Sequence, residues 1–399
     1  MIHQFASSLH ISVKADEILQ VGGISITNSH LLGALGLLVL LWIMLRTRAA
    51  ALGKKKPTFV TRLVNWTFDG LYGTVKQVIQ DDVWAARVAP LTITIFFFVI
   101  AYMSIRYFIN QIEKYPRVTF EEVYNSKKLR QKYNIEDNKA NPYDYGYNFK
   151  EIEYKSGKIQ LYGWFIENKE ATKTMIISHG RGVNRLASLQ YLEMFKNIGL
   201  DKEYNFFIPD LRNSGKSDVA KTKMGYCFGQ DIFHTMEMLN EKFGKNNFTL
   251  YGFSQGGIGS AIASKMYIKT LRKKGIVIDK LILDSSISNI RKRIKEDAKK
   301  RRVPKFIVSV IVRIFNLRVG SHLDKLRLSY LLKRIPTLII QSKNDKATTY
   351  GMLMEEYNEL AQNENIKLKV FEKGSHTRIY ADPECKDEYA EAVKEFLTN

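Results

Sequence analysis

Cysteine is scarce in this sequence, and its scarcity excludes one class of protein. The 399 residues contain only Cys227 and Cys385, so the chain can form one internal disulfide at most. A small secreted scaffold held by several disulfides is therefore excluded. No cluster of cysteines and histidines has the spacing of a zinc site, so neither a structural metal nor another cofactor is expected.

Acidic residues are also in short supply. Lysine and arginine number 61 against 40 aspartates and glutamates, which gives a net charge of +21. A balance of this size favours anionic partners such as membrane headgroups or nucleic acid. No nucleic-acid recognition module accompanies the basic residues, so a nucleic-acid partner is not expected.

Tyrosine and lysine are nearly absent from the first hundred residues. Only Tyr72 of 21 tyrosines lies there. From about residue 110 the chain becomes rich in Lys, Tyr, Asn and Ile. The change marks a boundary. A domain boundary, a recent fusion and two joined reading frames are all compatible with it.

Two long apolar runs predict that region 1–110 is a membrane region. The segment 24–45 contains LLGALGLLVLLWIML, and the segment 88–109 contains APLTITIFFFVIAYMSI with charge only at Arg106. A transmembrane helix needs about 20 mostly apolar residues, and both segments reach that length. Buried core helices or an uncleaved signal sequence are the alternatives.

Basic residues are concentrated between the two predicted spans. Residues 46–87 carry eight lysines and arginines, whereas only Lys14 precedes the first span. The positive-inside rule places this loop in the cytoplasm and everything after residue 110 on the extracytoplasmic side. Arg106, Lys114 and Arg117 argue against this orientation.

The first hundred residues resemble the start of a known membrane subunit. HISVKADEILQVGGISITNSHLLGALGLLVLLWIMLRTR and RVAPLTITIFFFVIA are similar to the opening helices of ATP synthase subunit a, the proton-channel subunit. The later helices of that family, including the one with its essential arginine, have no counterpart here. The resemblance therefore implies an anchor without proton translocation.

Residues 149–399 alternate short apolar strands with helices, after a polar stretch, 111–148, that reads as a linker with a short helix near 120–133. Such alternation predicts an α/β fold with a mostly parallel sheet and helices on both faces. In such sheets, ligands bind beyond the carboxyl ends of the strands. Polar residues directly after a strand are therefore the candidates for a site.

One such residue is Ser254, in the pentapeptide Gly252-Phe-Ser-Gln-Gly256 between a predicted strand and a predicted helix. This is the G-x-S-x-G pattern of a nucleophile elbow. A serine hydroxyl needs a base, and His376, just after the last predicted strand, is the candidate. Asp345 is the preferred acid to orient the base, and Asp284 is its rival. Along the chain, the three residues come in the order Ser254, Asp345, His376, which is the order expected for this fold.

The negative oxygen of a tetrahedral intermediate needs two backbone donors. Gln255 supplies the first, next to the nucleophile, and Arg181, after the strand TMIIS, is the candidate for the second. The charged side chain of Arg181 is unusual beside an oxyanion. It either points to solvent or meets an anionic group of the substrate.

Seven segments together resemble one superfamily: SHGRGVNR, PDLRNSGKSD, MGYCFGQD, YGFSQGG, ILDSSIS, SKNDKATT and GSHTR. In this order they are similar to alpha/beta-hydrolase serine hydrolases of the prolyl-oligopeptidase-like and Bem46-like branch. The resemblance implies a structural role for Asp210, Arg212, Gly215 and Ser217. The aspartate of SKND departs mildly from the family, which more often has a glycine-containing loop there.

The segment 286–335 reads as a cap inserted into this fold. Its residues 291–305 include nine lysines and arginines, and an apolar stretch, FIVSVIVRIF, follows. One interpretation is a solvated helix beside a core-facing helix. The other is a lid that touches an anionic membrane surface and borders an apolar channel.

Two functions of different classes follow. The first is a membrane-anchored serine hydrolase that acts on a carboxylic ester, thioester or peptide-like bond in a small acyl or peptide-like substrate, with membrane lipid as a partner. The second is a non-catalytic membrane component or fusion, in which the part similar to subunit a carries the function.

Overall fold

The computed structural model describes residues 17–21, 24–27, 42, 45, 46, 48, 49, 52, 53, 56, 58–135 and 139–399. The chain divides into two compact units, Met1–Ile109 and Asn110–Asn399. The division lies close to the change of composition near residue 110.

The N-terminal unit contains a short hairpin and two helices. The hairpin pairs β1 (Glu17–Val21) with β2 (Ile24–Thr27), and the helices are α2 (Phe59–Ile79) and α3 (Asp82–Glu113), whose last turn enters the second unit. With 32 residues, α3 is about 48 Å long, which exceeds the roughly 30 Å of a bilayer core. Among the described residues it is the one helix long and apolar enough to cross a membrane.

The predicted first span differs from the structure where the two can be compared. Ile24–Thr27 form the strand β2 rather than the start of a helix, since Ile-Ser-Ile-Thr alternates apolar and polar side chains and three of the four are β-branched. Residues 28–41 of this span lie outside the described residues. The second predicted span, 88–109, lies within α3. The described residues therefore contain one candidate membrane helix, α3, and do not establish a second.

The C-terminal unit alternates strands and helices as the sequence pattern predicts. Its strands are β3 (Lys150–Ser156), β4 (Ile159–Ile166), β5 (Lys173–Ser178), β6 (Tyr204–Asp210), β7 (Asn247–Phe253), β8 (Val277–Asp284), β9 (Thr337–Ser342) and β10 (Ile366–Phe371). Its α-helices are α4 (Phe120–Asn125), α5 (Lys127–Tyr133), α6 (Leu189–Asn197), α7 (Tyr226–Phe243), α8 (Gln255–Met266), α9 (Ile268–Lys273), α10 (Ile290–Lys300), α11 (Lys305–Arg318), α12 (Leu328–Leu331), α13 (Tyr350–Tyr357) and α14 (Lys386–Thr398). Short 3₁₀ turns lie at Pro142–Tyr145, Arg185–Ser188, Lys223–Gly225 and Leu323–Lys325.

The eight strands form one sheet in the order β10-β9-β8-β7-β5-β6-β4-β3. Five neighbouring pairs from β10 to β6 are parallel, whereas β4 is antiparallel to both β6 and β3. The carboxyl ends of the parallel strands therefore share one edge of the sheet, and the segments that follow β5, β7, β9 and β10 meet there.

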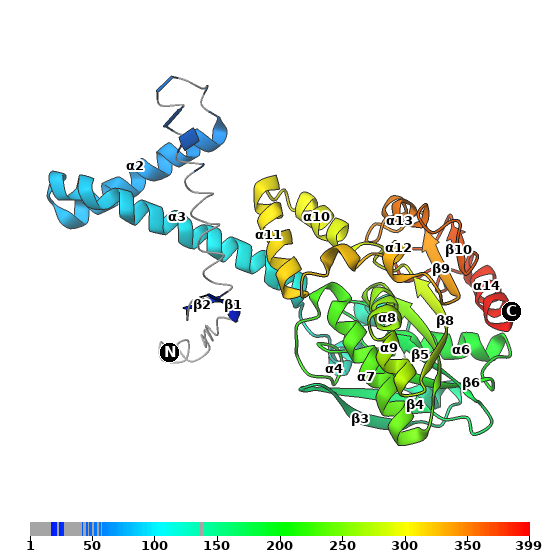
Figure 1. The fold of residues 1–399 in the computed structure, drawn as a ribbon. Helices are drawn as coiled ribbons and strands as arrows, with labels where there is room; N and C mark the ends of the chain where they lie inside the picture. Colours follow the sequence, from blue (N-terminus) through cyan, green and yellow to red (C-terminus); the bar gives the residue numbers. More distant parts are fainter. Residues whose placement is uncertain are drawn as a thin grey trace. The chain divides into compact units, whose positions relative to one another are not determined.

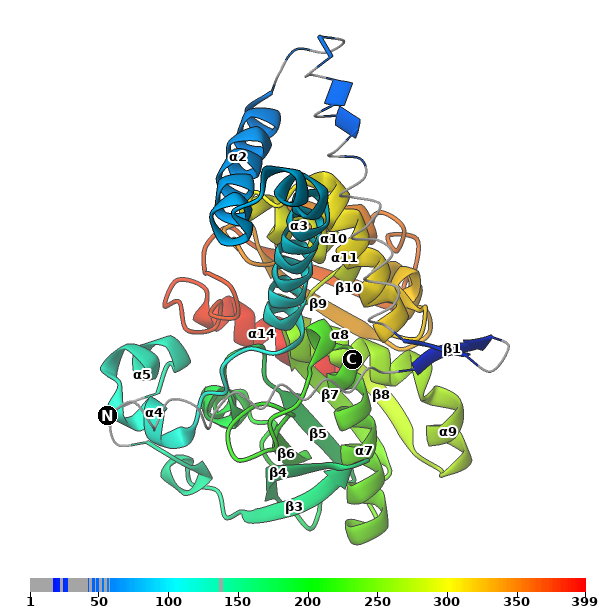
Figure 2. The same cartoon turned by 90° about the vertical axis from the view of Figure 1, so that its left-hand side faces the viewer.

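Helices cover both faces of the sheet (Figures 1 and 2). Helices α7, α8 and α9 lie on one side, and α6 and α14 lie on the other. On the second side, Met175 and Ile177 of β5 pack into an apolar cluster with residues of α6 and α14, while Ile176 faces the opposite side. Because both faces of these strands are buried, their sequences are nearly continuous runs of apolar residues.

The predicted linker, 111–148, packs against this cluster. Val123, Tyr133 and Tyr145 are buried in it, since the tyrosine-rich stretch supplies large apolar rings. The predicted cap, 286–335, contains α10, α11 and α12, and α10 and α11 lie at the top of this unit in Figure 1.

Candidate active site

Ser254 lies in a sharp turn between β7 and α8. Its backbone has φ 52° and ψ −112°, a left-handed conformation that is strained for a residue with a side chain. Two flanking glycines make the turn sterically feasible. A Cβ at Gly256 would lie 2.3 Å from the carbonyl oxygen of Ser178, and one at Gly252 would lie 2.6 Å from that of Gly256. The turn is the elbow geometry that the pentapeptide predicts.

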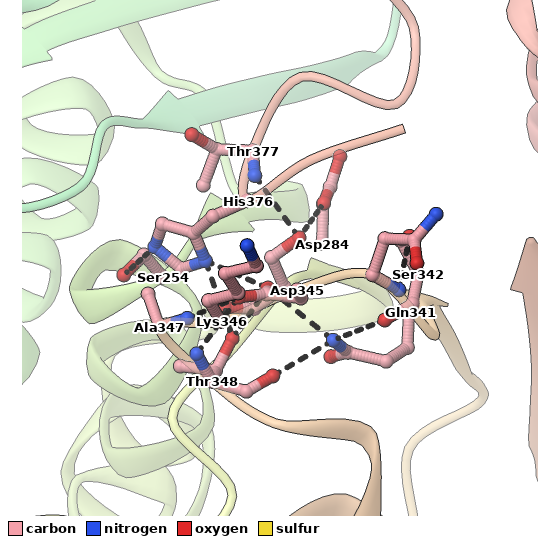
Figure 3. Close-up of polar contacts among 12 residues, drawn as sticks. Ser254, Asp284, Gln341, Ser342, Asp345, Lys346, Ala347, Thr348, His376 and Thr377 are labelled. Carbon is pink, nitrogen blue, oxygen red and sulfur yellow. Dashed lines mark hydrogen bonds and ion pairs between the residues drawn. The ribbon is translucent and has the colours of Figure 1, made fainter. Parts of the chain in front are cut away.

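His376 lies in the loop after β10 and bridges Ser254 to Asp345 (Figure 3). Its Nε2 lies 2.9 Å from the hydroxyl oxygen of Ser254, and its Nδ1 lies 2.7 Å from Oδ2 of Asp345. A carboxylate only accepts hydrogen bonds, so the neutral ring carries its proton on Nδ1. Nε2 is then free to accept the serine proton.

Asp345 lies in the loop after β9, and its carboxylate accepts several hydrogen bonds. The backbone N–H groups of Ala347 and Thr348 donate to Oδ1 over 2.7 and 2.9 Å, and the hydroxyl of Thr348 donates to Oδ2 over 2.8 Å. Burial by itself would raise the pKa of Asp345, but the bonds from His376 and Thr348 outweigh it and hold this pKa below its usual value. The carboxylate therefore stays charged at neutral pH.

Asp284, the rival acid, occupies a different place. It is fully buried at the end of β8 and accepts hydrogen bonds of 2.7 Å from the hydroxyls of Tyr389 and Ser285. Burial raises the pKa of Asp284 to about 6. The same Ser285 hydroxyl oxygen accepts the backbone N–H of Thr377, next to His376, over 3.1 Å. Asp284 thus supports the histidine loop indirectly, while Asp345 contacts the ring.

The loop after β5 lies directly against Ser254. A Cβ at Gly180 would lie 3.1 Å from Cβ of Ser254, so this close approach favours glycine. His179 fixes the loop, since its Nε2 accepts the backbone N–H of Leu211 over 3.0 Å and its Nδ1 donates to the carbonyl of Gly180 over 2.8 Å. Burial lowers the pKa of His179, which keeps the ring neutral. Neutrality is what this bonding pattern requires.

Both predicted oxyanion residues, Arg181 and Gln255, line the same cavity as Ser254. The Arg181 side chain contacts the last turn of α3 and the residues directly after it. Its Nη2 donates to the carbonyl of Gln111 over 2.6 Å, and its guanidinium lies 5.1 Å from the ring centroid of Tyr115. The side chain is therefore held by the protein rather than released to solvent.

The cavity in front of Ser254 has a volume of about 390 Å³, which is within the usual range for small-molecule sites. Apolar and aromatic side chains form much of its wall, among them Tyr191, Phe253 and Ile287. Sequence reasoning missed Thr348 and Arg293, which also line it. Their positions depend on how the loop after β9 and the helix α10 fold back over the sheet edge.

The loop after β6 is tied down by the residues for which the superfamily resemblance implies a structural role. Asp210 accepts the backbone N–H groups of Arg185 and Lys216, each over 3.0 Å. A Cβ at Gly215 would lie 2.2 Å from the carboxylate of Asp210, and its φ is 49°. Arg212 forms a buried ion pair of 2.6 Å with Asp231 on α7.

Metal-ligating residues do not cluster in the part of the chain that the structure describes, where no group of three or more His, Cys, Asp or Glu side chains could hold an ion. In the same part of the chain, Cys227 and Cys385 are both free and buried.

Comparison with known proteins identifies the fold. A family model described as alpha/beta hydrolase fold matches residues 173–308. A solved esterase from Pyrococcus furiosus is 21% identical with a TM-score of 0.50, and the alignment covers 71% of this chain and 96% of the esterase. A Butyrivibrio proteoclasticus protein, Est1E, solved with ferulic acid, is 18% identical with a TM-score of 0.45 over 62% of this chain and 98% of its own.

An uncharacterised Bacillus subtilis protein, YqkD, is 25% identical over 262 residues, which are 65% of this chain and 78% of the relative. The fold is therefore that of the alpha/beta hydrolases, and with the family match it supports an enzyme of the hydrolase class. The resemblance of the first hundred residues to subunit a lies outside the matched residues and stays a prediction.

Proposed function

We propose that this protein is a membrane-anchored serine hydrolase that cleaves a carboxylic ester, thioester or peptide-like bond. The observation that carries the proposal is the continuous hydrogen-bonded chain from Ser254 through His376 to Asp345 at the carboxyl edge of the sheet. These are the nucleophile, base and orienting acid of acyl transfer.

The first half of the reaction forms an acyl-enzyme. The Ser254 oxygen attacks the carbonyl carbon of the substrate while Nε2 of His376 accepts the hydroxyl proton. The ring is then positively charged, and the carboxylate of Asp345 stabilises that charge. Collapse of the tetrahedral intermediate breaks the bond to the leaving group, which takes the proton from His376. A water molecule, activated by the same histidine, then attacks the acyl-enzyme and regenerates Ser254.

The negative oxygen of each intermediate needs fixed donors. The backbone N–H groups of Gln255 and Arg181 are the candidates, because both residues line the cavity beside Ser254. Removal of one such donor costs on the order of 3 kcal/mol of barrier. The bonds that hold His179 keep the loop in place while charge develops.

A fluorophosphonate probe tests the nucleophile. The full chain in detergent should be labelled, and Ser254→Ala should abolish both labelling and hydrolysis of short 4-nitrophenyl esters. Ser309→Ala, a matched change at an exposed serine of α11, should leave both intact. A folded wild-type chain that neither reacts with the probe nor hydrolyses esters would exclude this function and favour the alternative of a non-catalytic membrane component.

The membrane part of the proposal is supported by α3 and by the cap. A groove between α10 and α11 carries Lys295, Lys299, Arg302 and Lys305 beside Val308, a combination that suits an anionic headgroup with an acyl chain. Arg318, at the end of α11, forms an ion pair with Glu113, the last residue of α3. Membrane lipid is therefore the proposed partner of the cap.

Sidedness is tested by protease added to intact cells. With the basic loop 46–87 in the cytoplasm, the C-terminal unit is extracytoplasmic and should be digested from outside. Digestion only after the cells are broken would place it in the cytoplasm. Extraction at high pH supplies the control for anchoring, because a chain held by α3 stays with the membrane pellet.

A further inference from the structure

The catalytic cavity carries positive charge and no opposing acid in its wall. Arg181, Arg293 and Arg378 line it together with Ser254, and none of its described lining residues is an aspartate or glutamate. Hydrolysis of a neutral ester needs no such charge, since the triad and the oxyanion donors supply the chemistry. The three arginines therefore require a separate explanation.

Arg293 comes from the cap helix α10 and is the most informative of the three. Its side chain is 17% exposed and forms one ion pair, in which Nη2 lies 3.0 Å from Oδ1 of Asp297. The other terminal nitrogen, Nη1, is buried and has no hydrogen-bond partner among the described residues. Buried donors are normally paired, so this unpaired donor, on a residue that lines the cavity, leaves the guanidinium with hydrogen-bonding capacity for a ligand acceptor.

The other two arginines strengthen the positive field. Arg181 is held by the neutral carbonyl of Gln111 and the face of Tyr115, and the acid that acts on its charge, Asp297, already pairs with Arg293. Arg378, two residues after His376, is exposed at the rim of the cavity. A carboxylate that enters this cavity would meet guanidinium groups from three separate segments. Guanidinium groups bind carboxylates with paired, charge-assisted hydrogen bonds.

We propose that the substrate of this site carries an anionic carboxylate, which the guanidinium of Arg293 in the cap binds while the scissile carbonyl lies at Ser254. The inference rests on the proposed hydrolase function and narrows its substrate class. It assigns the cap a role in substrate selection. It also makes Arg293 a specificity residue, since the triad and the oxyanion donors do not include it.

Matched pairs of esters test the proposal. One pair places the charge on the acyl side, 4-nitrophenyl hydrogen adipate against 4-nitrophenyl hexanoate. The other places it on the leaving group, 3-carboxyphenyl butanoate against 3-carbamoylphenyl butanoate. For the wild-type full chain in neutral detergent, kcat/KM should favour the anionic member of at least one pair by about tenfold or more, as expected for one charge-assisted contact.

The variant Arg293→Gln should abolish that preference, mainly by raising KM for the anionic ester, and should leave hydrolysis of the neutral ester within about threefold. Arg293→Lys keeps the charge and should retain part of the preference. Arg293→Gln combined with Asp297→Asn avoids an unpaired carboxylate if the single variant folds poorly. Arg291→Gln is the matched control on the same helix, because Arg291 pairs with Asp324 and does not line this cavity.

Failure of this inference is distinct from failure of the proposed function. A chain that reacts with the fluorophosphonate and hydrolyses neutral esters, yet shows no anionic preference in either pair, overturns the carboxylate site and leaves the hydrolase intact. A preference that survives in Arg293→Gln also overturns the assignment of Arg293. Loss of all labelling and hydrolysis in the wild type would instead remove the hydrolase.

Discussion

At the scale of a single residue, Thr348 holds Asp345, the proposed catalytic acid, in place. Its hydroxyl lies 2.8 Å from Oδ2 of Asp345 and 2.9 Å from the carbonyl oxygen of Ser285, and its backbone N–H donates to Oδ1 of Asp345. The hydroxyl has one proton, so it donates to one of the two oxygens at a time. Loss of this hydroxyl leaves the backbone bonds to Oδ1 and a longer, 3.3 Å bond from Gln341 to Oδ2, so Oδ2 is held less firmly toward His376.

Thr348→Val should therefore lower kcat by roughly tenfold while KM changes little, because the lost interaction orients the base rather than the substrate. Valine has nearly the same shape as threonine, so packing is kept. Thr348→Ser restores the hydroxyl and should restore most of the rate. Steady-state kinetics with a neutral 4-nitrophenyl ester make the measurement. Equal rates for the valine and serine variants would show that the hydroxyl has no part in orienting Asp345.

At the scale of elements, the segment before the sheet is joined to it through Arg185. This side chain is fully buried, and its guanidinium lies 4.3 Å from the ring centroid of Trp164 on β4 and 4.9 Å from that of Phe120 on α4. Ion pairs with Glu151 and Asp210 balance its charge. The helix α4 is thus fixed to the sheet by a cation between two aromatic rings.

Arg185→Met should destabilise the C-terminal unit by about 3–5 kcal/mol, because it leaves the buried carboxylate of Asp210 without its cation. Urea unfolding of the full chain, followed by tryptophan fluorescence, measures the change. Arg272→Met, an exposed arginine on α9, is the control and should stay within about 0.5 kcal/mol of wild type. A similar small effect at Arg185 would mean that the aromatic contacts alone hold α4.

The sequence predicts the sheet and its helices well because each strand carries its own apolar run and each helix its own period. Ser254, Asp345 and His376 can be predicted in the same way, since each lies at or within a few residues of the carboxyl end of a strand. Residues 111–148 differ from the strands and helices, because their polar composition indicates a linker and only the three-dimensional packing shows that Tyr133 is buried. Arg293 lies on a basic helix, where nothing local separates it from its exposed neighbours.

At the scale of the whole molecule, stability depends on pH through groups whose pKa changes on folding. Asp345 has a lowered pKa in the folded chain, so its stabilisation is present at neutral pH and is lost as the pH falls. Asp284 acts in the opposite sense. Burial raises its pKa from 3.8 to about 6, so between these values the folded chain keeps a proton that the unfolded chain has released.

The contribution of Asp284 is therefore fully present below pH 3.8 and is lost as the pH rises through 6, with an upper limit of about 3 kcal/mol. Asp284→Asn removes this titration. Relative to wild type, its free energy of unfolding should increase between pH 4 and about pH 7, whatever constant offset the amide introduces. Urea unfolding at half-unit steps of pH measures the difference. A difference for Asp284→Asn that is flat with pH would mean that this buried carboxyl has the same pKa in the folded and unfolded chains.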